Sequence, residues 1–235
     1  MTHIAGIKNK MKKIILALDE IQDIDDVVAL VKKVGNLVYA VKIHNLYDKF
    51  GPNIVDKLKE AGAEKVWVDF KLLDIPNTGK LRAESIGADI ISVHASSGAK
   101  MMREVVASGK EIFAITILTS LSGDEVKQIY NREVNEQVLI LATMAKEAGV
   151  AGIVCSPLEL KMLRSHPEFK GLKLVVPGIR SAGVSANDQS RVSTPLEALQ
   201  NGADYLVIGR QITQAENPEA EIGKLLEEIN KYKGI

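Results

Sequence analysis

The sequence predicts an α/β fold, a single-domain (β/α)8 TIM barrel, because eight short apolar runs alternate with longer helical patterns along its 235 residues. Glycines stand near the ends of the helical patterns, as is typical where helices stop. Polar residues follow the apolar runs, and barrels of this kind form their active sites at the carboxyl ends of the strands. A doubly wound open sheet is the alternative, but no G-x-G-x-x-G sequence follows the first run, which disfavours its dinucleotide-binding version.

The apolar runs give the expected strands, and the glycines between them give the expected helix ends. We expect strands at residues 13–19, 37–44, 65–72, 90–96, 111–119, 152–156, 173–179 and 205–210. A glycine stands shortly before every strand after the first, and each is expected to take the left-handed conformation that closes a helix: Gly35, Gly62, Gly87, Gly109, Gly149, Gly171 and Gly202. The same stop signal at every junction favours a regular βα repeat over scattered glycines.

Helix starts carry matching signals. Ser156 and Thr194 each stand before a proline and three residues before a glutamate, which predicts two capping boxes with proline at the first helical position. Asn217 repeats the cap followed by proline. The last helix is expected at residues 218–232, with one apolar stripe formed by Ile222, Leu225, Leu226 and Ile229.

Composition limits the partners of the chain. Thirty basic and thirty acidic side chains cancel, so no nucleic-acid or membrane partner is indicated. The single cysteine, Cys155, excludes an intrachain disulfide, which fits a reducing, cytoplasmic location. It lies in an apolar run and is expected to be a core residue. No H-E-x-x-H pattern or Cys/His cluster is present, so no metal site is expected.

The beginning of the chain differs from the rest. Residues 1–12 are polar and basic and are expected to form an N-terminal arm before a barrel domain of residues 13–235. The apolar run at residues 14–18 is too short for a signal-peptide core or a membrane span, so a soluble protein is expected. Met11 is a second candidate start, and no chemistry is assigned to the arm.

The third expected strand carries an acid and a base on one face. Side chains alternate along a strand, so Trp67, Asp69 and Lys71 share one face. The other face is apolar and consists of Val66, Val68, Phe70 and Leu72. Asp74 follows just beyond the strand. Buried charges persist when they are paired or when function needs them, so the alternatives are a structural ion pair and a catalytic array.

Other strand ends contribute polar groups to the same expected mouth. These residues are Asp19, Lys42, His44, His94, Thr119, Arg180 and Arg210. Taken singly each has an ordinary explanation, such as a helix cap for Asp19 or a hydrogen-bonded core histidine for His94. The arginines after strands seven and eight match the usual phosphate site of such barrels, where Gly178 and Gly209 would let backbone N–H groups approach. The polar loop 181–191 would close over a bound phosphate as a lid.

The pattern D-x-K-x-x-D-I-P-N-T at residues 69–78 is highly specific, and the chain around it resembles the orotidine 5′-monophosphate decarboxylase family. The resemblance covers roughly residues 13–213, with further matches in family order at 16–19, 41–42, 118–120, 176–180, 188–189 and 207–210. It implies decarboxylation of orotidine 5′-monophosphate to uridine 5′-monophosphate in de novo pyrimidine biosynthesis. It also implies that neither a cofactor nor a metal is used.

The resemblance assigns the charged residues by position. It implies that Lys71 donates the proton and that Asp69 lies beside the substrate carboxylate. Lys42 would belong to the same charged network, and Asp19 would bind the ribose hydroxyls. Asp69 and Asp74 would keep Lys71 charged and oriented. The catalytic residues implied are therefore Lys71, Asp69, Asp74 and Lys42.

Further contacts are also implied by the resemblance. Asp74, Ile75 and Thr78 would reach into the site of the neighbouring subunit, which implies a homodimer. Thr119 would line the pyrimidine side, and Ser122 could replace it or add to it. The phosphate would be held by Arg180, Gln189, Gly209 and Arg210.

The chain departs from the family pattern at one loop, and two other functions remain as alternatives. Residues 186–191 read A-N-D-Q-S-R where many relatives have G-D-Q-x-R, and Asp188 has no secure role. Hexulose-phosphate synthases and keto-gulonate phosphate decarboxylases share the D-x-K-x-x-D strand but use magnesium to hold an enediolate. The continuation I-P-N-T at residues 75–78 argues against them. A non-catalytic nucleotide-phosphate binder would need the arginines but not the alternating charges of the third strand.

Overall fold

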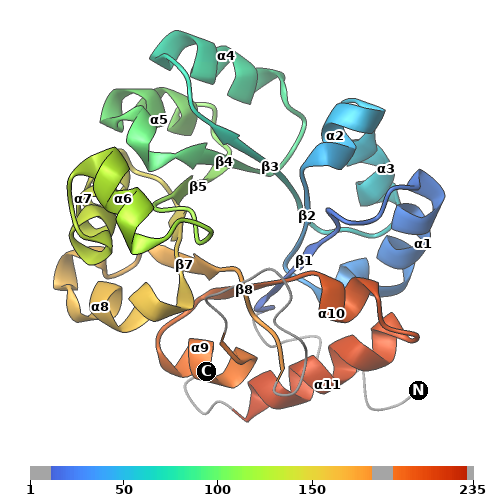
Figure 1. Ribbon diagram of the computed structural model, residues 1–235. Coiled ribbons are helices and arrows are strands. Elements are labelled where there is room, and N and C mark those ends of the chain that lie inside the picture. Colours follow the sequence, from blue (N-terminus) through green and yellow to red (C-terminus); the bar gives the residue numbers. More distant parts are fainter. Residues whose placement is uncertain (1–11, 182–192, 232–235) are drawn as a thin grey trace.

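The computed structural model describes residues 12–181 and 193–231, which form a closed barrel of eight parallel strands ringed by helices (Figure 1). The strands are β1 Ile14–Ala17, β2 Ala40–Ile43, β3 Val66–Leu72, β4 Ile90–His94, β5 Glu111–Ile115, β6 Gly152–Val154, β7 Lys173–Val176 and β8 Tyr205–Ile208. The first strand pairs with the last, with Ile15 opposite Val207, so the sheet closes on itself. The (β/α)8 barrel is therefore confirmed over the open sheet. The division into an arm and a barrel domain stays a prediction, because residues 1–11 lie outside the described part.

Helices follow the strands around the outside of the barrel. The α-helices are α1 Ile24–Val34, α2 Asn45–Phe50, α3 Ile54–Glu60, α4 Pro76–Ser85, α5 Ala99–Val106, α6 Gly123–Tyr130, α7 Val134–Glu147, α8 Leu160–Ser165, α9 Pro195–Gln200, α10 Arg210–Thr213 and α11 Pro218–Asn230. Short 3-10 turns lie at η2 Gly35–Leu37, η3 Ala95–Ser97, η4 Pro157–Glu159 and η5 Pro167–Phe169. Among the described residues, no helix is both long and apolar enough to cross a bilayer.

Several strands end earlier than the sequence predicted. β5 ends at Ile115 rather than at Thr119, and β8 ends at Ile208. Arg210 begins the short helix α10 instead of closing a strand. These polar residues therefore lie beyond the last hydrogen bonds of their strands. In that position the chain can direct a polar side chain toward the mouth of the barrel.

The glycine prediction is correct at five of the seven junctions. Left-handed backbone is observed at Gly62, Gly109, Gly149, Gly171 and Gly202. At Gly35 the prediction was wrong, since φ is −58°. A Cβ there would lie 2.9 Å from Val31 and 3.2 Å from backbone atoms of residues 62 and 63, so close packing explains this glycine. Gly87 is also not left-handed, and its position is open to solvent.

The expected helix caps form, with two differences. Ser156 makes the complete capping box with Glu159, although the turn it starts is the 3-10 segment η4. Thr194 accepts a hydrogen bond from the Glu197 backbone N–H, but the Glu197 carboxylate accepts from the Ser193 hydroxyl. Asn217 caps α11, whose buried stripe is Ile222, Leu225 and Ile229, with Leu226 partly buried. Local cap chemistry therefore fixes where these elements begin.

Two apolar layers position the mouth of the barrel. The larger one lies between strands and helices and includes Cys155, whose burial raises the pKa of its thiol, as expected of a core residue. The smaller one fills the barrel interior with Ile15, Ala40, Trp67, Ile90, Phe113, Val175 and Val207. Trp67 and Phe113 meet edge to face with ring centroids 5.3 Å apart. The interior is a packed core, so a ligand site must lie above it.

A polar cluster covers the amino-terminal end of the strands. Glu111 accepts hydrogen bonds from the Tyr39 hydroxyl and from the ammonium groups of Lys65 and Lys173, each at about 2.7 Å. Burial disfavours the charged form of Glu111, but the hydrogen bonds outweigh it and hold its pKa below the ordinary value. Tyr205 stacks on Tyr39 with centroids 4.1 Å apart. These groups satisfy one another, which is typical of a structural network.

Candidate active site

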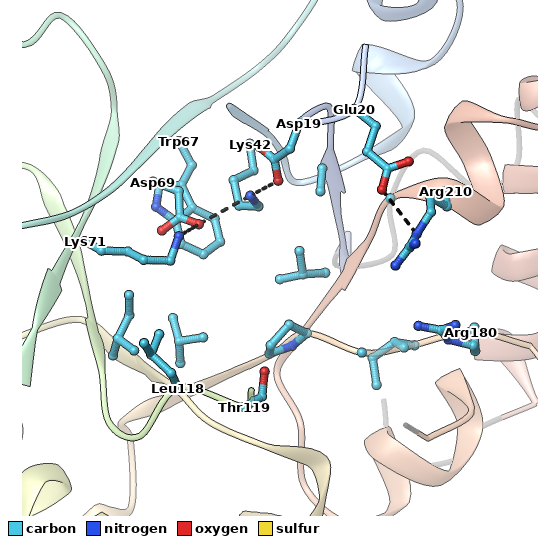
Figure 2. Close-up of a pocket in the computed structure, with 18 of the residues that line it drawn as sticks. Asp19, Glu20, Lys42, Trp67, Asp69, Lys71, Leu118, Thr119, Arg180 and Arg210 are labelled. Atoms are coloured by element: carbon cyan, nitrogen blue, oxygen red, sulfur yellow. Dashed lines mark hydrogen bonds and ion pairs between the residues drawn. The ribbon is translucent and has the colours of Figure 1, made fainter. Parts of the chain in front are cut away.

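A cavity of about 350 Å³ opens at the carboxyl end of the strands, which is where the sequence predicted the polar groups to gather (Figure 2). Its volume lies within the range of small-molecule sites. Predicted site residues that line it are Asp19, Lys42, Asp69, Lys71, Thr119, Arg180, Gly209 and Arg210. Segments far apart in the sequence therefore meet at one mouth.

Four side chains form a continuous series of alternating charges along one wall of the cavity. The Lys42 ammonium contacts Asp19 and lies 3.3 Å from Asp69 Oδ2. The Lys71 ammonium donates to the same Asp69 oxygen at 2.8 Å. Strand register explains the order, because Ala17 in β1 lies opposite Lys42 in β2, and β2 pairs in turn with β3. The series runs from minus to plus twice and ends at the ammonium of Lys71.

The buried pair at the centre of this series is held ionised. Burial alone would raise the pKa of Asp69, but the charges of Lys42 and Lys71 and the hydrogen bonds of Lys71 and Ser92 lower it to about 2. Burial would lower the pKa of Lys42, but Asp69 and Asp19 raise it above its ordinary value. Asp69 and Lys42 are each only 8% exposed, whereas the Lys71 side chain is 34% exposed. Lys71 is thus the cation that faces the open cavity.

Lys71 has an unusual backbone. Its φ is 53°, a left-handed conformation that costs a residue with a Cβ about 1–3 kcal/mol. The register of β3 against β4 shifts here. Val68 pairs with Ile91 and Leu72 pairs with Val93, so β3 advances four residues while β4 advances two. The bulge lies at the end of the strand, next to the cavity, where bulges commonly redirect a side chain. The predicted face of Trp67, Asp69 and Lys71 still points into the cavity.

Neighbouring residues support Asp69 from behind. The Nδ1 atom of His44 lies 2.7 Å from the Asp69 carbonyl oxygen. The Ser92 hydroxyl donates to Asp69 Oδ1 at 2.6 Å. Burial and the nearby Lys71 charge lower the pKa of His94, so this histidine is neutral at pH 7. The sequence predicted His44 and His94 among the polar groups of the mouth, but neither lines the cavity. Ser92 was not predicted, although a serine within an apolar strand beside the charged one was a signal for it.

Across from the ammonium groups, the cavity has an apolar wall. Figure 2 shows Leu118 and Thr119 on the side of the cavity opposite Asp19 and Lys42. Other apolar residues that line the cavity are Ile115, Ile117, Val154, Pro177 and Ile179. A planar group held against it would face the charged series.

Two arginines lie at the end of the cavity away from Lys71 (Figure 2). Arg180 follows β7, and its backbone N–H donates to the Ser193 carbonyl at 3.1 Å. Arg210 follows β8, and its Nε lies 3.3 Å from Glu20 Oε1. No local pattern indicated Glu20, because its partner Arg210 is distant along the chain. Gly178 has φ of 77°, which a residue with a Cβ rarely adopts.

Three of the predicted site residues do not line the cavity of their own chain. Asp74, Ile75 and Thr78 are exposed on the β3–α4 loop and the first turn of α4. The Asp74 carboxylate accepts from the Ile75 backbone N–H at 2.7 Å. Gln189, Asp188 and most of the expected lid lie outside the described residues. Within the described part, no three acidic, histidine or cysteine side chains are grouped as metal ligands.

Fold and site together define a barrel enzyme with a buried charge series facing one end of its cavity and arginines facing the other. The family model described as "Orotidine 5′-phosphate decarboxylase / HUMPS family" matches residues 12–225, and the chain belongs to this family. The resemblance stated from the sequence is therefore confirmed.

Individual relatives agree with the family assignment. The chain is 41% identical to an orotidine 5′-phosphate decarboxylase of Vibrio cholerae over 93% of this chain and 96% of the relative. It is 38% identical to one of Prochlorococcus marinus, over 92% and 96% respectively. The crystal structure of orotidine 5′-phosphate decarboxylase from Lactobacillus acidophilus is similar with a TM-score of 0.78 and 31% identity, over 93% of this chain and 99% of that one.

The left-handed backbone of Lys71 gives a testable prediction about stability. Lys71→Gly should be more stable to urea unfolding than Lys71→Ala by about 1 kcal/mol, since both lose the ammonium but only glycine relieves the left-handed strain. At Leu72, where the backbone is not left-handed, the order of the two variants should reverse. Equal stability of the two Lys71 variants would show that no strain is stored at this position.

Proposed function

We propose that the chain decarboxylates orotidine 5′-monophosphate to uridine 5′-monophosphate in de novo pyrimidine biosynthesis, in the cytoplasm and without a cofactor. The observation that carries the proposal is the arrangement of one cavity, with the Asp69–Lys71 pair at one end and Arg180 and Arg210 at the other. A nucleotide has its base and its phosphate at opposite ends, so it matches this separation.

The charges suit the loss of carbon dioxide from a pyrimidine ring. Breaking the bond between ring carbon and carboxylate leaves an electron pair on the carbon with no conjugated group to accept it. Enzymes lower barriers by about 8–23 kcal/mol in general, and this reaction needs the upper part of that range. A unit charge about 4 Å from another interacts by about 4 kcal/mol at an effective dielectric near 20. The Lys71 ammonium beside the forming carbanion therefore supplies a substantial share.

Proton transfer completes the reaction at the same residue. As carbon dioxide leaves, the electron pair remains on the ring carbon and takes a proton from Lys71 Nζ. The amine left behind then regains a proton from solvent, to which the Lys71 side chain is 34% exposed. Asp69 and Lys42 keep the array charged through the cycle. Repulsion between Asp69 and the substrate carboxylate would add to the effect by raising the energy of the ground state.

The rest of the cavity accommodates the ribose, base and phosphate. Asp19 binds the ribose hydroxyls, which is supported by its buried Oδ1 atom, since among the described residues no hydrogen-bond partner reaches it. Thr119 faces the pyrimidine. Ser122 is disfavoured for that role because its hydroxyl is engaged with Glu125 in the cap of α6. The phosphate is held by Arg180, Gln189, Gly209 and Arg210.

The exposed residues after β3 support the proposal of a homodimer. Asp74, Ile75 and Thr78 lie outside the cavity of their own chain, and Ile75 is 66% exposed. Leu73 and Leu81 are also large exposed apolar residues, at 63% and 58%. If a second copy covers this surface, the three residues reach the cavity of that second copy. Asp74 then supplies a further carboxylate to the charged network there.

The decisive experiment is to add orotidine 5′-monophosphate and follow the loss of its ultraviolet absorbance. Activity should survive EDTA, which separates this reaction from the magnesium-dependent relatives. Lys71→Ala should lower kcat by about 10⁴-fold or more, because both charge stabilisation and proton donation are lost. The variant should still fold and bind uridine 5′-monophosphate. Normal kcat in Lys71→Ala would refute the mechanism, and an inactive wild type would refute the function.

The phosphate site is tested by Arg210→Ala. One charge-assisted hydrogen bond contributes about 1.5–3 kcal/mol, so kcat/KM for the nucleotide should fall about 10- to 100-fold. Slow turnover of orotidine, which lacks the phosphate, should not change. Arg132→Ala removes an exposed arginine of α6–α7 and serves as the matched control. An equal loss on nucleotide and nucleoside would assign Arg210 a role other than phosphate binding.

The shared site is tested by mixing two inactive variants, Lys71→Ala and Asp74→Ala. Random pairing makes half of the dimers mixed, and each mixed dimer has one intact site, so about a quarter of wild-type activity should return. The two preparations are denatured together and refolded to allow exchange. If every site were completed within one chain, the mixture would stay inactive.

A further inference from the structure

Ser92 lies in the middle of β4 and is fully buried in the barrel wall. Its hydroxyl donates a hydrogen bond to Asp69 Oδ1 at 2.6 Å. The same hydroxyl accepts from the backbone N–H of Lys71 at 3.0 Å. A serine hydroxyl has a single O–H to donate, and Asp69 takes it, so the two contacts give this group both a donor and an acceptor role within the site.

The contact with Lys71 falls at the strained point of β3. The bulge between Val68 and Leu72 removes Lys71 from the regular ladder with β4. Its N–H would need another acceptor, since a buried backbone donor without one is costly. The Ser92 hydroxyl is that acceptor, and it thereby holds the left-handed conformation that turns the Lys71 side chain toward the cavity.

The contact with Asp69 fixes the other half of the ion pair. Asp69 Oδ2 faces the two ammonium groups, at 2.8 Å from Lys71 and 3.3 Å from Lys42. Oδ1 faces Ser92, so rotation of the carboxylate would break contacts on both sides. One hydroxyl therefore links the side chain of Asp69 to the main chain of Lys71.

We infer that Ser92 is a positioning residue for the decarboxylation proposed above, aligning Asp69 and Lys71 with the reacting carboxylate. The inference rests on that proposed function. Ser92 contacts neither Asp19, where the ribose is proposed to bind, nor the two arginines, where the phosphate is proposed to bind. Its loss should therefore affect the chemical step far more than the affinity for nucleotide.

The test compares Ser92→Ala with Ser97→Ala. Ser97 belongs to the segment that follows β4, and its hydroxyl donates to the His94 carbonyl at 2.6 Å, but it contacts neither Asp69 nor Lys71. Ser92→Ala should lower kcat about 100-fold, the loss that a small misplacement of reacting groups can cause. The dissociation constant of uridine 5′-monophosphate, measured by calorimetry, should change less than about threefold, since the product lacks the carboxylate. Ser97→Ala should keep wild-type kcat.

Ser92→Cys covers the case in which the alanine variant does not fold. It fills nearly the same volume with a much weaker hydrogen-bond donor, so it should fold and still lose kcat. The inference is overturned if a folded Ser92 variant keeps kcat within twofold of wild type, or if its loss is one of nucleotide affinity alone. Failure of the wild type to consume orotidine 5′-monophosphate would instead overturn the proposed function.

Discussion

The site depends on one buried carboxylate, that of Asp69. It is 8% exposed and stays ionised because two ammonium groups and a hydroxyl offset the cost of its burial. The dependence is mutual, because Lys42 is equally buried and keeps its charge only beside Asp69 and Asp19. Removal of one member would leave a buried charge without its counterpart. The series therefore behaves as a unit, with Lys42 and Asp69 buried at its centre and Asp19 and Lys71 partly exposed at its two ends.

Barrel geometry accounts for the order of the charges. Lys42 and Asp69 come from the neighbouring strands β2 and β3, Asp19 follows the end of β1, and the bulged end of β3 adds Lys71. The packed interior around Trp67 and Phe113 forms the floor below them, so the charges lie at the boundary between core and cavity. There the surroundings are buried enough to strengthen electrostatic interactions, while Asp19 and Lys71 remain partly exposed to the cavity.

The sequence was sufficient for the barrel and for the charges, because both follow from local periodicity. Alternation in β3 predicted Asp69 and Lys71 on one face, and both line the cavity, although Lys71 reaches it from a left-handed residue at a bulge. The contacts of Ser92 and Glu20 were not predictable in the same way, since they depend on the register between distant segments. Ser92 meets Asp69 only because a bulge shifts β3 against β4, and no local pattern announces that bulge. Gly35 was misjudged for a related reason, since its need for glycine comes from packing against residues 62 and 63.

The two ends of the barrel differ in character, and the strained backbone of Lys71 lies at the carboxyl end of the strands. A glycine would take the left-handed backbone at less cost, but it has no ammonium group, so the proposed reaction requires a residue that destabilises its own strand. The rest of the fold must supply the compensating stability. At the amino-terminal end, Tyr39, Lys65, Glu111 and Lys173 satisfy one another and leave no group directed at a ligand. The amino-terminal end of the strands thus holds a mutually satisfied network, whereas the carboxyl end holds both the strained residue and the charges that line the cavity.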